Sequence, residues 1–237
     1  MNVHIVKFCI CCSVAIAFAA PTRAALVISE VLYNEPGSDG GGEWIEIFNS
    51  GPTAIDLSSY KIGDEEEMNP SSAESGGMWQ FPAGASIPAG AVQIIARSAS
   101  VFATNNSFSP TYEVDDTDGA VPNMINYTAW SNNPTPQITM ANSNDQVLLL
   151  DGSDALVDTV SWGNTFSFNP GLDADAEGDG QSYERINAFV DTDSAADWRL
   201  GNPSSPGTVP VPEPAGISLV AFFAGIVGMR SRLRRCV

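Results

Sequence analysis

The segment Leu26–Asp64, LVISEVLYNEPGSDGGGEWIEIFNSGPTAIDLSSYKIGD, decides the fold of this 237-residue chain. It contains two apolar runs, Leu26–Tyr33 and Trp44–Phe48, that are rich in the Val, Ile and aromatic residues typical of strands. The loop between them is rich in Gly, Asp and Pro, which favour a chain reversal. The segment therefore predicts a β-hairpin that opens a mostly-β domain.

The same criteria predict further strands downstream. Met78–Pro82 is a short strand that ends at its proline, and Ala91–Ala96 follows a proline-glycine turn. The runs Gln146–Leu150 and Ala155–Trp162 flank the turn DGSD and predict a second hairpin. One helical turn is expected at Ala99–Ala103. The pattern of many short strands is typical of an all-β sandwich.

The composition of residues 105–137, rich in Asn, Pro, Thr and Asp, predicts a long loop. It carries four aromatic side chains, Phe108, Tyr112, Tyr127 and Trp130. A loop of this length usually packs on the domain or has a function. Two interpretations stay open: the aromatic residues fix the loop to the sandwich, or they form a surface on which carbohydrate stacks.

The charge of the chain is strongly acidic, with 28 Asp and Glu against 10 Lys and Arg. Of the basic residues, only Lys61, Arg97, Arg185 and Arg199 lie between Glu30 and Glu213, the span that contains all 28 acidic residues, so this span has a net charge of −24. Such a surface repels the phosphate backbone, which argues against nucleic acid as a partner. The acidity indicates solubility at an outer surface or binding of a cation.

Cysteine and histidine are confined to the ends of the sequence, at His4, Cys9, Cys11, Cys12 and Cys236. Without the ends, the chain has no disulfide framework. It also lacks the residues of a Ser-His-Asp or Cys-His mechanism and of a His/Cys zinc site.

Residues 1–24 predict a secretory signal peptide. The apolar run Phe8–Ala20 has the length of a signal core, and the small residues at Thr22 and Ala24 place cleavage after Ala24. The alternative is a buried first helix. Cleavage predicts export through the Sec machinery.

The C-terminal end has three parts. They are a proline-rich linker at residues 209–214 that contains Pro212, Glu213 and Pro214, a hydrophobic helix at residues 215–229, and a basic tail at residues 230–237. Fifteen apolar residues are marginal for a span of about 30 Å. The arginines of the tail favour the cytoplasmic side of the inner membrane.

An acidic loop resembles the calcium-binding template. Its candidate ligands are Asp173, Asp175, Glu177, Asp179 and Glu184, with Gly178 at the turn position. Glu177 and Gly180 depart from the template, and no helices flank the loop. The alternatives are a bound calcium ion and a solvated acidic loop, and no other cofactor is expected.

Carboxylate chemistry is the only enzymatic class that the composition leaves open. Glu30, Glu43 and Glu46 lie in the opening hairpin and offer candidate pairs for a carbohydrate-active enzyme. Glu43 and Glu46 point to opposite faces of one strand, however, because they are three residues apart. A structural role is the alternative, and we expect no catalytic residues.

Several motifs resemble the lamin-tail domain in its bacterial, secreted form. They are ISEVLYN (Ile28–Asn34), EWIEIFN (Glu43–Asn49), AIDLSSYKI (Ala54–Ile62), IPAGAVQII (Ile87–Ile95), NDQVLLLDGSDALVDTVSW (Asn144–Trp162), QSYER (Gln181–Arg185) and DWRLGNPSSPGT (Asp197–Thr208). The resemblance implies an immunoglobulin-like β-sandwich over residues 25–208.

The C-terminal end resembles the PEP-CTERM sorting signal. This resemblance implies cleavage near Pro212, Glu213 and Pro214 by a membrane-embedded exosortase-type protease in a Gram-negative bacterium that makes exopolysaccharide or biofilm. We therefore expect a non-enzymatic surface or matrix protein with an adhesion or interaction module, held only transiently in the inner membrane. Exopolysaccharide and other matrix components are the expected partners, and a permanently anchored accessory module is the alternative.

Overall fold

The computed structural model describes residues 25–37, 40–64, 76–130, 137–163, 171–172 and 180–210. These residues form short strands and one α-helix. In chain order the elements are β1 (Leu26–Leu32), β2 (Trp44–Asn49), β3 (Ile55–Asp56), β4 (Lys61–Gly63), β5 (Met78–Gln80), β6 (Ser86–Ile87), β7 (Val92–Ala96), α1 (Ala99–Asn106), β8 (Tyr112–Glu113), β9 (Ile125–Asn126), β10 (Asp145–Leu150), β11 (Leu156–Trp162), β12 (Gly171–Leu172), β13 (Ser182–Arg185), a 3₁₀ turn (Ala195–Asp197) and β14 (Trp198–Gly201).

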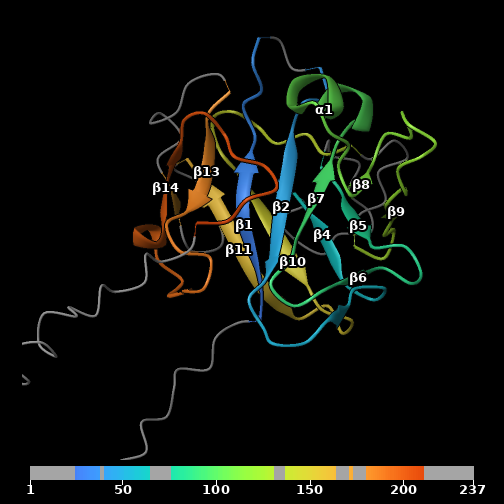
Figure 1. The fold of residues 1–237 in the computed structure, drawn as a ribbon, viewed down its shortest axis with the longest axis horizontal. Helices are drawn as coiled ribbons and strands as arrows, with labels where there is room; N and C mark the ends of the chain where they lie inside the picture. Colours follow the sequence, from blue (N-terminus) through green and yellow to red (C-terminus); the bar gives the residue numbers. More distant parts are fainter. Residues whose placement is uncertain are drawn as a thin grey trace, which may run out of the picture.

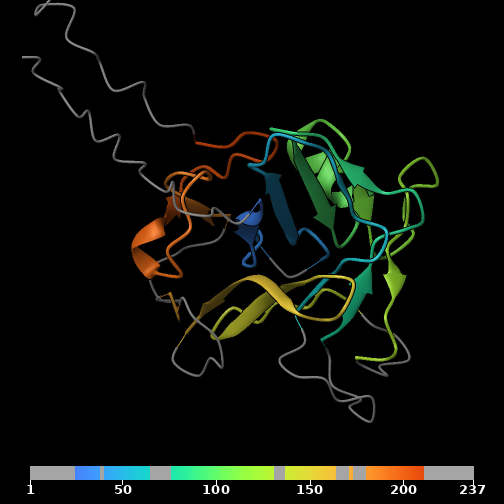
Figure 2. The same ribbon diagram turned by 90° about the horizontal axis from the view of Figure 1, so that it is seen from below.

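The strands form two six-stranded sheets that pack face to face (Figures 1 and 2). The first sheet has the strand order β14-β13-β1-β2-β7-β8, and the second has the order β12-β11-β10-β4-β5-β9. A small pair, β3 and β6, lies apart from both. The predicted all-β, immunoglobulin-like sandwich is therefore confirmed.

The core lies between the sheets, where the inward residues of alternating strands meet. Ile45 and Ile47 of β2 are fully buried there, and so are Val147 and Leu149 of β10. Aromatic rings join the layers: Tyr33 stacks on Trp162 of the second sheet with centroids 4.2 Å apart and planes 9° apart. Burial of such side chains is the main stabilising contribution of a sandwich.

Both predicted hairpins are present, but the region after β7 is more regular than expected. The helix α1 has eight residues and exceeds the single turn predicted at Ala99–Ala103. Ser98 caps it by accepting a hydrogen bond from Val101 N, and Glu113 accepts one from Ala99 N at 3.0 Å. The second contact comes from β8, far along the chain, so the local sequence does not reveal it.

The long loop and the QSYER motif also differ from expectation. Residues 105–137 contain the end of α1 together with β8 and β9, which pair with β7 and β5. QSYER, which the sequence marked only as a lamin-tail motif, contains β13, which lies between β14 and β1 inside the first sheet. Long-range pairing overrides local loop composition at these places.

Several sequence predictions fall on residues that the structure does not describe. They are the signal peptide with its cleavage site Ala24, the hydrophobic helix at residues 215–229, the basic tail, and the motif Pro212, Glu213 and Pro214. No helix within the described ranges is long and apolar enough to cross a membrane.

Candidate functional site

Three glutamates from neighbouring strands lie in register on the outer face of the first sheet. Glu30 of β1 pairs with Glu184 of β13 on one side and with Glu46 of β2 on the other. A bulge adds Ser29 as an extra residue opposite the β2 strand. Ser29 Oγ donates to Glu46 Oε1 at 2.7 Å. We call Glu30, Glu46 and Glu184 the carboxylate row.

Residues 202–210 cross this row, and we call them the clasp. The clasp is attached through its main chain: Ser205 N donates to Glu30 Oε1 at 2.8 Å, and Gly207 N donates to Glu46 Oε2 at 2.6 Å. Gly207 adopts a φ of 87°, a left-handed conformation that glycine tolerates. The clasp is thus held by carboxylates that accept its backbone N–H groups.

A single serine hydroxyl joins two members of the row. Ser205 Oγ lies 3.1 Å from both Glu30 Oε2 and Glu184 Oε2. Ser182 Oγ also donates to Glu30. Arg199 donates to Glu184 Oε1 at 2.8 Å, but its side chain is 52% exposed. The row therefore has one solvated positive charge for three buried carboxyl groups.

Burial favours the neutral form of two of these groups. It raises the pKa of Glu46 to about 8, although hydrogen bonds from Ser29 and Gly207 oppose the shift. The neighbouring carboxylates Glu30 and Glu184 raise this pKa further. Burial likewise raises the pKa of Glu30. Glu46 therefore retains at neutral pH a proton that a solvated glutamate would release.

Glu43 lies at the start of β2 in a separate buried site. Its carboxylate contacts Arg97 Nη1 at 3.3 Å, and the same guanidinium reaches Asp115 at 3.5 Å. Burial raises the pKa of Glu43 to about 8 against the opposing charge of Arg97. Glu43 and Glu46 thus occupy different environments, as their spacing predicts.

Glu35 organises the loop between β1 and β2. Its carboxylate accepts backbone hydrogen bonds from Gly40, Gly41 and Gly42. A Cβ at Gly42 would lie 2.0 Å from Glu35 Oε2, so the close approach requires glycine. The glycine run that predicted a turn therefore also builds a ring of N–H donors for a buried acid.

Arg185 of β13 links the two sheets. Its Nη2 lies 2.8 Å from Asp158 Oδ2 on β11, and its Nε donates to Ile28 O at 2.7 Å. Asp191 pairs with Nη1 at 3.1 Å, and the guanidinium lies over the Trp198 ring at 4.8 Å. Both charged side chains of the Arg185–Asp158 pair are almost fully buried. This pair is structural, because Arg185 binds Asp158 of the second sheet and the main chain of β1.

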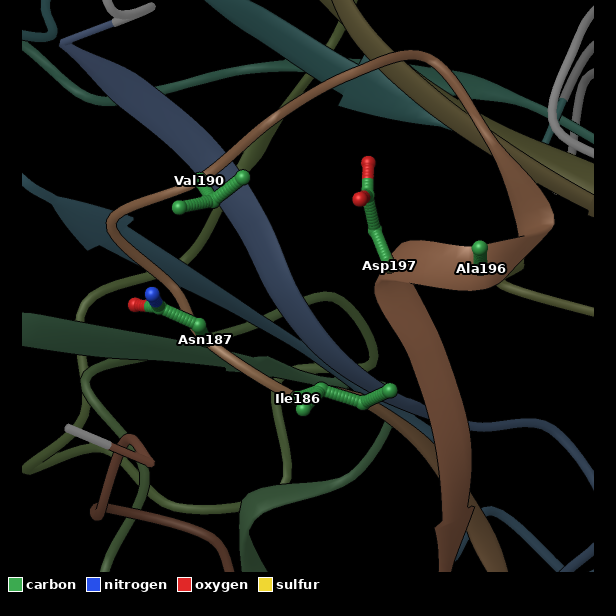
Figure 3. A pocket seen from close by; sticks show the side chains of 5 residues that line it. All are labelled: Ile186, Asn187, Val190, Ala196 and Asp197. Carbon is green, nitrogen blue, oxygen red and sulfur yellow. The ribbon is translucent and has the colours of Figure 1, made fainter. Parts of the chain in front are cut away.

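A small pocket of about 190 Å³ (Figure 3) lies next to Arg185, whose Nη1 is 3.8 Å from Oδ2 of the lining residue Asp197. Its lining residues are Ile186, Asn187, Val190, Ala196 and Asp197. The carboxylate of Asp197 is engaged by Thr192, whose backbone N donates at 2.7 Å and whose hydroxyl donates at 2.9 Å. The pocket contains neither Glu30 nor Glu46, so the candidate carboxylate pair does not face it.

The aromatic residues of the long loop are mostly used for packing. Tyr112 is buried and contacts the Phe81 ring edge-on at 5.3 Å. Trp130 is buried in a cluster with Met78 and Leu148. Phe108 is 43% exposed, yet its ring packs on Phe102 of α1.

Tyr127 takes part in a polar contact. Its hydroxyl donates to Asp154 at 2.9 Å, and Lys61 Nζ lies over its ring at 4.8 Å. Together with the packing of Tyr112 and Trp130, this contact favours the interpretation in which the aromatic residues fix the loop to the sandwich.

The predicted calcium ligands divide between two parts of the chain. Asp173, Asp175, Glu177 and Asp179 lie outside the described residues. Glu184 belongs to the carboxylate row, where Arg199 and Ser205 contact it. Among the residues that the structure describes, no group of three or more Asp, Glu, His or Cys side chains is arranged to hold a metal ion. The calcium site stays a prediction.

The candidate enzymatic pair is partly assembled but inaccessible. Glu30 and Glu46 lie side by side, as the hairpin suggested, whereas Glu43 is held by Arg97. Glu30 is 1% exposed and Glu46 is fully buried, and both accept hydrogen bonds from the clasp. Sequence reasoning missed the clasp. The signal that was available is an acidic residue in the middle of each apolar run, in ISEV, WIEIF and SYER.

Comparisons with known proteins agree with this architecture. A crystal structure of a DUF4876 family protein from Bacteroides thetaiotaomicron VPI-5482 is similar in fold, with a TM-score of 0.51 and 14% sequence identity. The similarity covers 82% of this chain and 74% of that one. No curated protein matches this chain in sequence.

The family model of the Lamin Tail Domain matches residues 19–164, which is more than half of the chain. The match ends just after β11, so β13, β14 and the clasp lie beyond it although they complete the first sheet. The chain belongs to the lamin tail domain family.

Proposed function

We propose that this protein is an exported, non-enzymatic interaction module that is displayed outside the inner membrane and sorted by its C-terminal segment. Lamin tail domains of this immunoglobulin-like type are typically non-catalytic. The buried carboxylates support this role, because Glu30, Glu35 and Glu46 accept hydrogen bonds from the protein's own backbone. Fold alone does not identify the partner.

The observation that carries the proposal is the position of the two ends of the sandwich. Ala25 O accepts a hydrogen bond from Ser50 N beside the end of β2. Val209 packs against the apolar cluster that contains Val27 and Phe48, so the end of the clasp lies near the beginning of β1. A C-terminal anchor that follows the clasp would therefore hold the domain by this side and leave the opposite side for partners.

The charge supports an extracellular partner that is not a nucleic acid. With 4 basic and 28 acidic residues between Glu30 and Glu213, the surface repels polyanions. Neutral exopolysaccharide or a matrix component fits the proposed location better. Processing by an exosortase-type protease at Pro212, Glu213 and Pro214 would release the domain from the membrane, and export through Sec would remove residues 1–24.

The test is a fractionation of Gram-negative cells that carry an exosortase. Native protein is compared with a variant in which Pro212, Glu213 and Pro214 are replaced by alanine. We expect the native protein outside the inner membrane in a shortened form, and the variant in washed inner membranes at full length. Identical distribution and mass of the two proteins would refute sorting by this motif. Native protein that stays full-length in the membrane would favour the permanent anchor.

A further inference from the structure

We propose that the carboxylate row is a proton-controlled latch for the clasp: protonated, it holds residues 202–210 on the first sheet, and its ionisation releases them. The proposal does not depend on the route of export. It rests on the arrangement of Glu30, Glu46 and Glu184 beneath the main chain of the clasp.

The hydrogen bonds around Glu46 lower its pKa, but a neutral carboxyl group can keep both of them. Its Oε2 accepts Gly207 N at 2.6 Å, and its Oε1 lies 2.7 Å from Ser29 Oγ. A protonated Oε1 can donate to that hydroxyl, while Oε2 still accepts the clasp. A neutral Glu46 therefore keeps both contacts without placing a charge in the row.

The contacts of the Ser205 hydroxyl also indicate that the row carries a proton. It lies 3.1 Å from one oxygen of Glu30 and from one oxygen of Glu184, yet it has one hydrogen to donate. If both carboxylates are ionised, one of these contacts lacks a hydrogen. If Glu30 is protonated, it donates to Ser205 Oγ, which donates to Glu184. The geometry is thus complete with a proton on the row.

The charges near the row do not compensate for ionisation. Arg199 of β14 is the cation that contacts it, and it binds Glu184 from a half-exposed position. On the other side, the β7 residue paired with Glu46 is Ile94, and the clasp itself has no charged side chain. Loss of protons therefore leaves like charges side by side in a buried site, which favours opening of the clasp to water.

The direction of the pH effect follows from linkage. Glu46 has a pKa of about 8 under the clasp, against an ordinary value of 4.5 when solvated. The closed state therefore binds more protons than the open state between these values. Opening becomes more favourable by about tenfold per pH unit in this window and levels off above it. Glu30 adds to the slope, because its pKa is also raised.

The test is hydrogen exchange of the full-length protein from pH 5 to pH 9, with each rate divided by the intrinsic rate at that pH. We expect protection of residues 202–210 to fall about tenfold per pH unit up to about pH 8 and to stay below the protection of β10 at each pH, because the clasp opens without unfolding of the sheets. Protection of the clasp that does not change over this range, or that equals the protection of β10, would overturn the proposal.

Two matched variants locate the proton. Gln in place of Glu46 keeps an acceptor for Gly207 N and a donor for Ser29 but cannot ionise. Between pH 5 and pH 8, protection of the clasp in Glu46→Gln should therefore fall by a factor at least about tenfold smaller than in the native protein. Glu43→Gln neutralises the other buried glutamate of pKa about 8, which does not contact the clasp, and should leave the dependence unchanged. An equal slope in native protein and Glu46→Gln would overturn the assignment.

Discussion

The Arg185–Asp158 pair and the carboxylate row are both buried and polar, but they balance charge differently. Arg185 matches Asp158 directly and is also bound by Asp191. The carboxylate row has three acids and one half-exposed arginine. The first arrangement can remain ionised, because opposite charges meet inside the protein. The second lowers its charge by retaining protons.

These two buried sites show that burial of an acid does not by itself indicate a reactive site. Perturbed carboxyl groups often mark catalysis. In this sandwich two of the perturbed groups, Glu30 and Glu46, lie under the clasp and hold backbone N–H groups in place, whereas Glu43 is paired with Arg97. The opening hairpin therefore supplies the carboxylates for a structural contact with the far end of the domain.

Among these variants, removal of Arg185 should lower the stability of the protein the most. Arg185→Met leaves Asp158 buried without its cation, and we expect a loss of about 3–5 kcal/mol in the free energy of unfolding. Thermal unfolding should show a fall in Tm of about 10 °C. Arg199→Met is the control, because its half-exposed side chain should contribute at most about 1 kcal/mol. Equal effects of the two variants would contradict the distinction.

The pH dependence of unfolding should reveal the row. Glu46 and Glu43 have pKa values of about 8 in the folded protein and ordinary values of 4.5 when unfolded. The folded state thus binds more protons in between, so stability should fall by a few kcal/mol as pH rises from about 4.5 to about 8. Urea unfolding at pH 5, 6.5 and 8 measures this change, and Glu46→Gln should reduce it. A stability that rises over this range would refute the protonated row.

Glu35 is a third kind of buried acid: its carboxylate is stabilised by backbone N–H groups and not by a cation. Gly42→Ala would force a Cβ to within 2.0 Å of Glu35 Oε2, so the carboxylate must leave its donors. We expect a loss of about 1–3 kcal/mol in urea unfolding. Gly119→Ala is the matched control, since its Cβ would meet no atom within 4 Å. A control that is equally destabilised would show that loss of glycine, and not the clash, is responsible.

Ser205→Ala should have the smallest effect. The change removes a hydroxyl that contacts Glu30 and Glu184 but keeps the backbone donor to Glu30. We expect about 1 kcal/mol or less at pH 5, measured by urea unfolding. A loss as large as that of Gly42→Ala would mean that the hydroxyl, and not the main chain, holds the clasp.

The strands with strong local patterns were predictable from sequence. Leu26–Tyr33, Trp44–Phe48 and the hairpin around DGSD gave the central strands of both sheets, because alternating apolar residues and turn residues are local signals. The lengths of α1, β8 and β9 were not predictable. Their stability comes from partners distant in sequence, such as Glu113 at the start of α1.

The candidate site was predictable only in part. The proximity of Glu30 and Glu46 followed from the hairpin, and so did the separation of Glu43. The place of Glu184 beside Glu30 was not predictable, because strand order between β13 and β1 has no local signature. The clasp contacts the row through backbone atoms, which a side-chain pattern does not record.

The intact mass of the protein recovered outside the inner membrane tests the functional account most directly. The account predicts a chain that begins after Ala24 and ends before the apolar segment at residues 215–229. A mass that retains Met1, or a chain that ends at Val237 after Cys236, would contradict export and C-terminal processing.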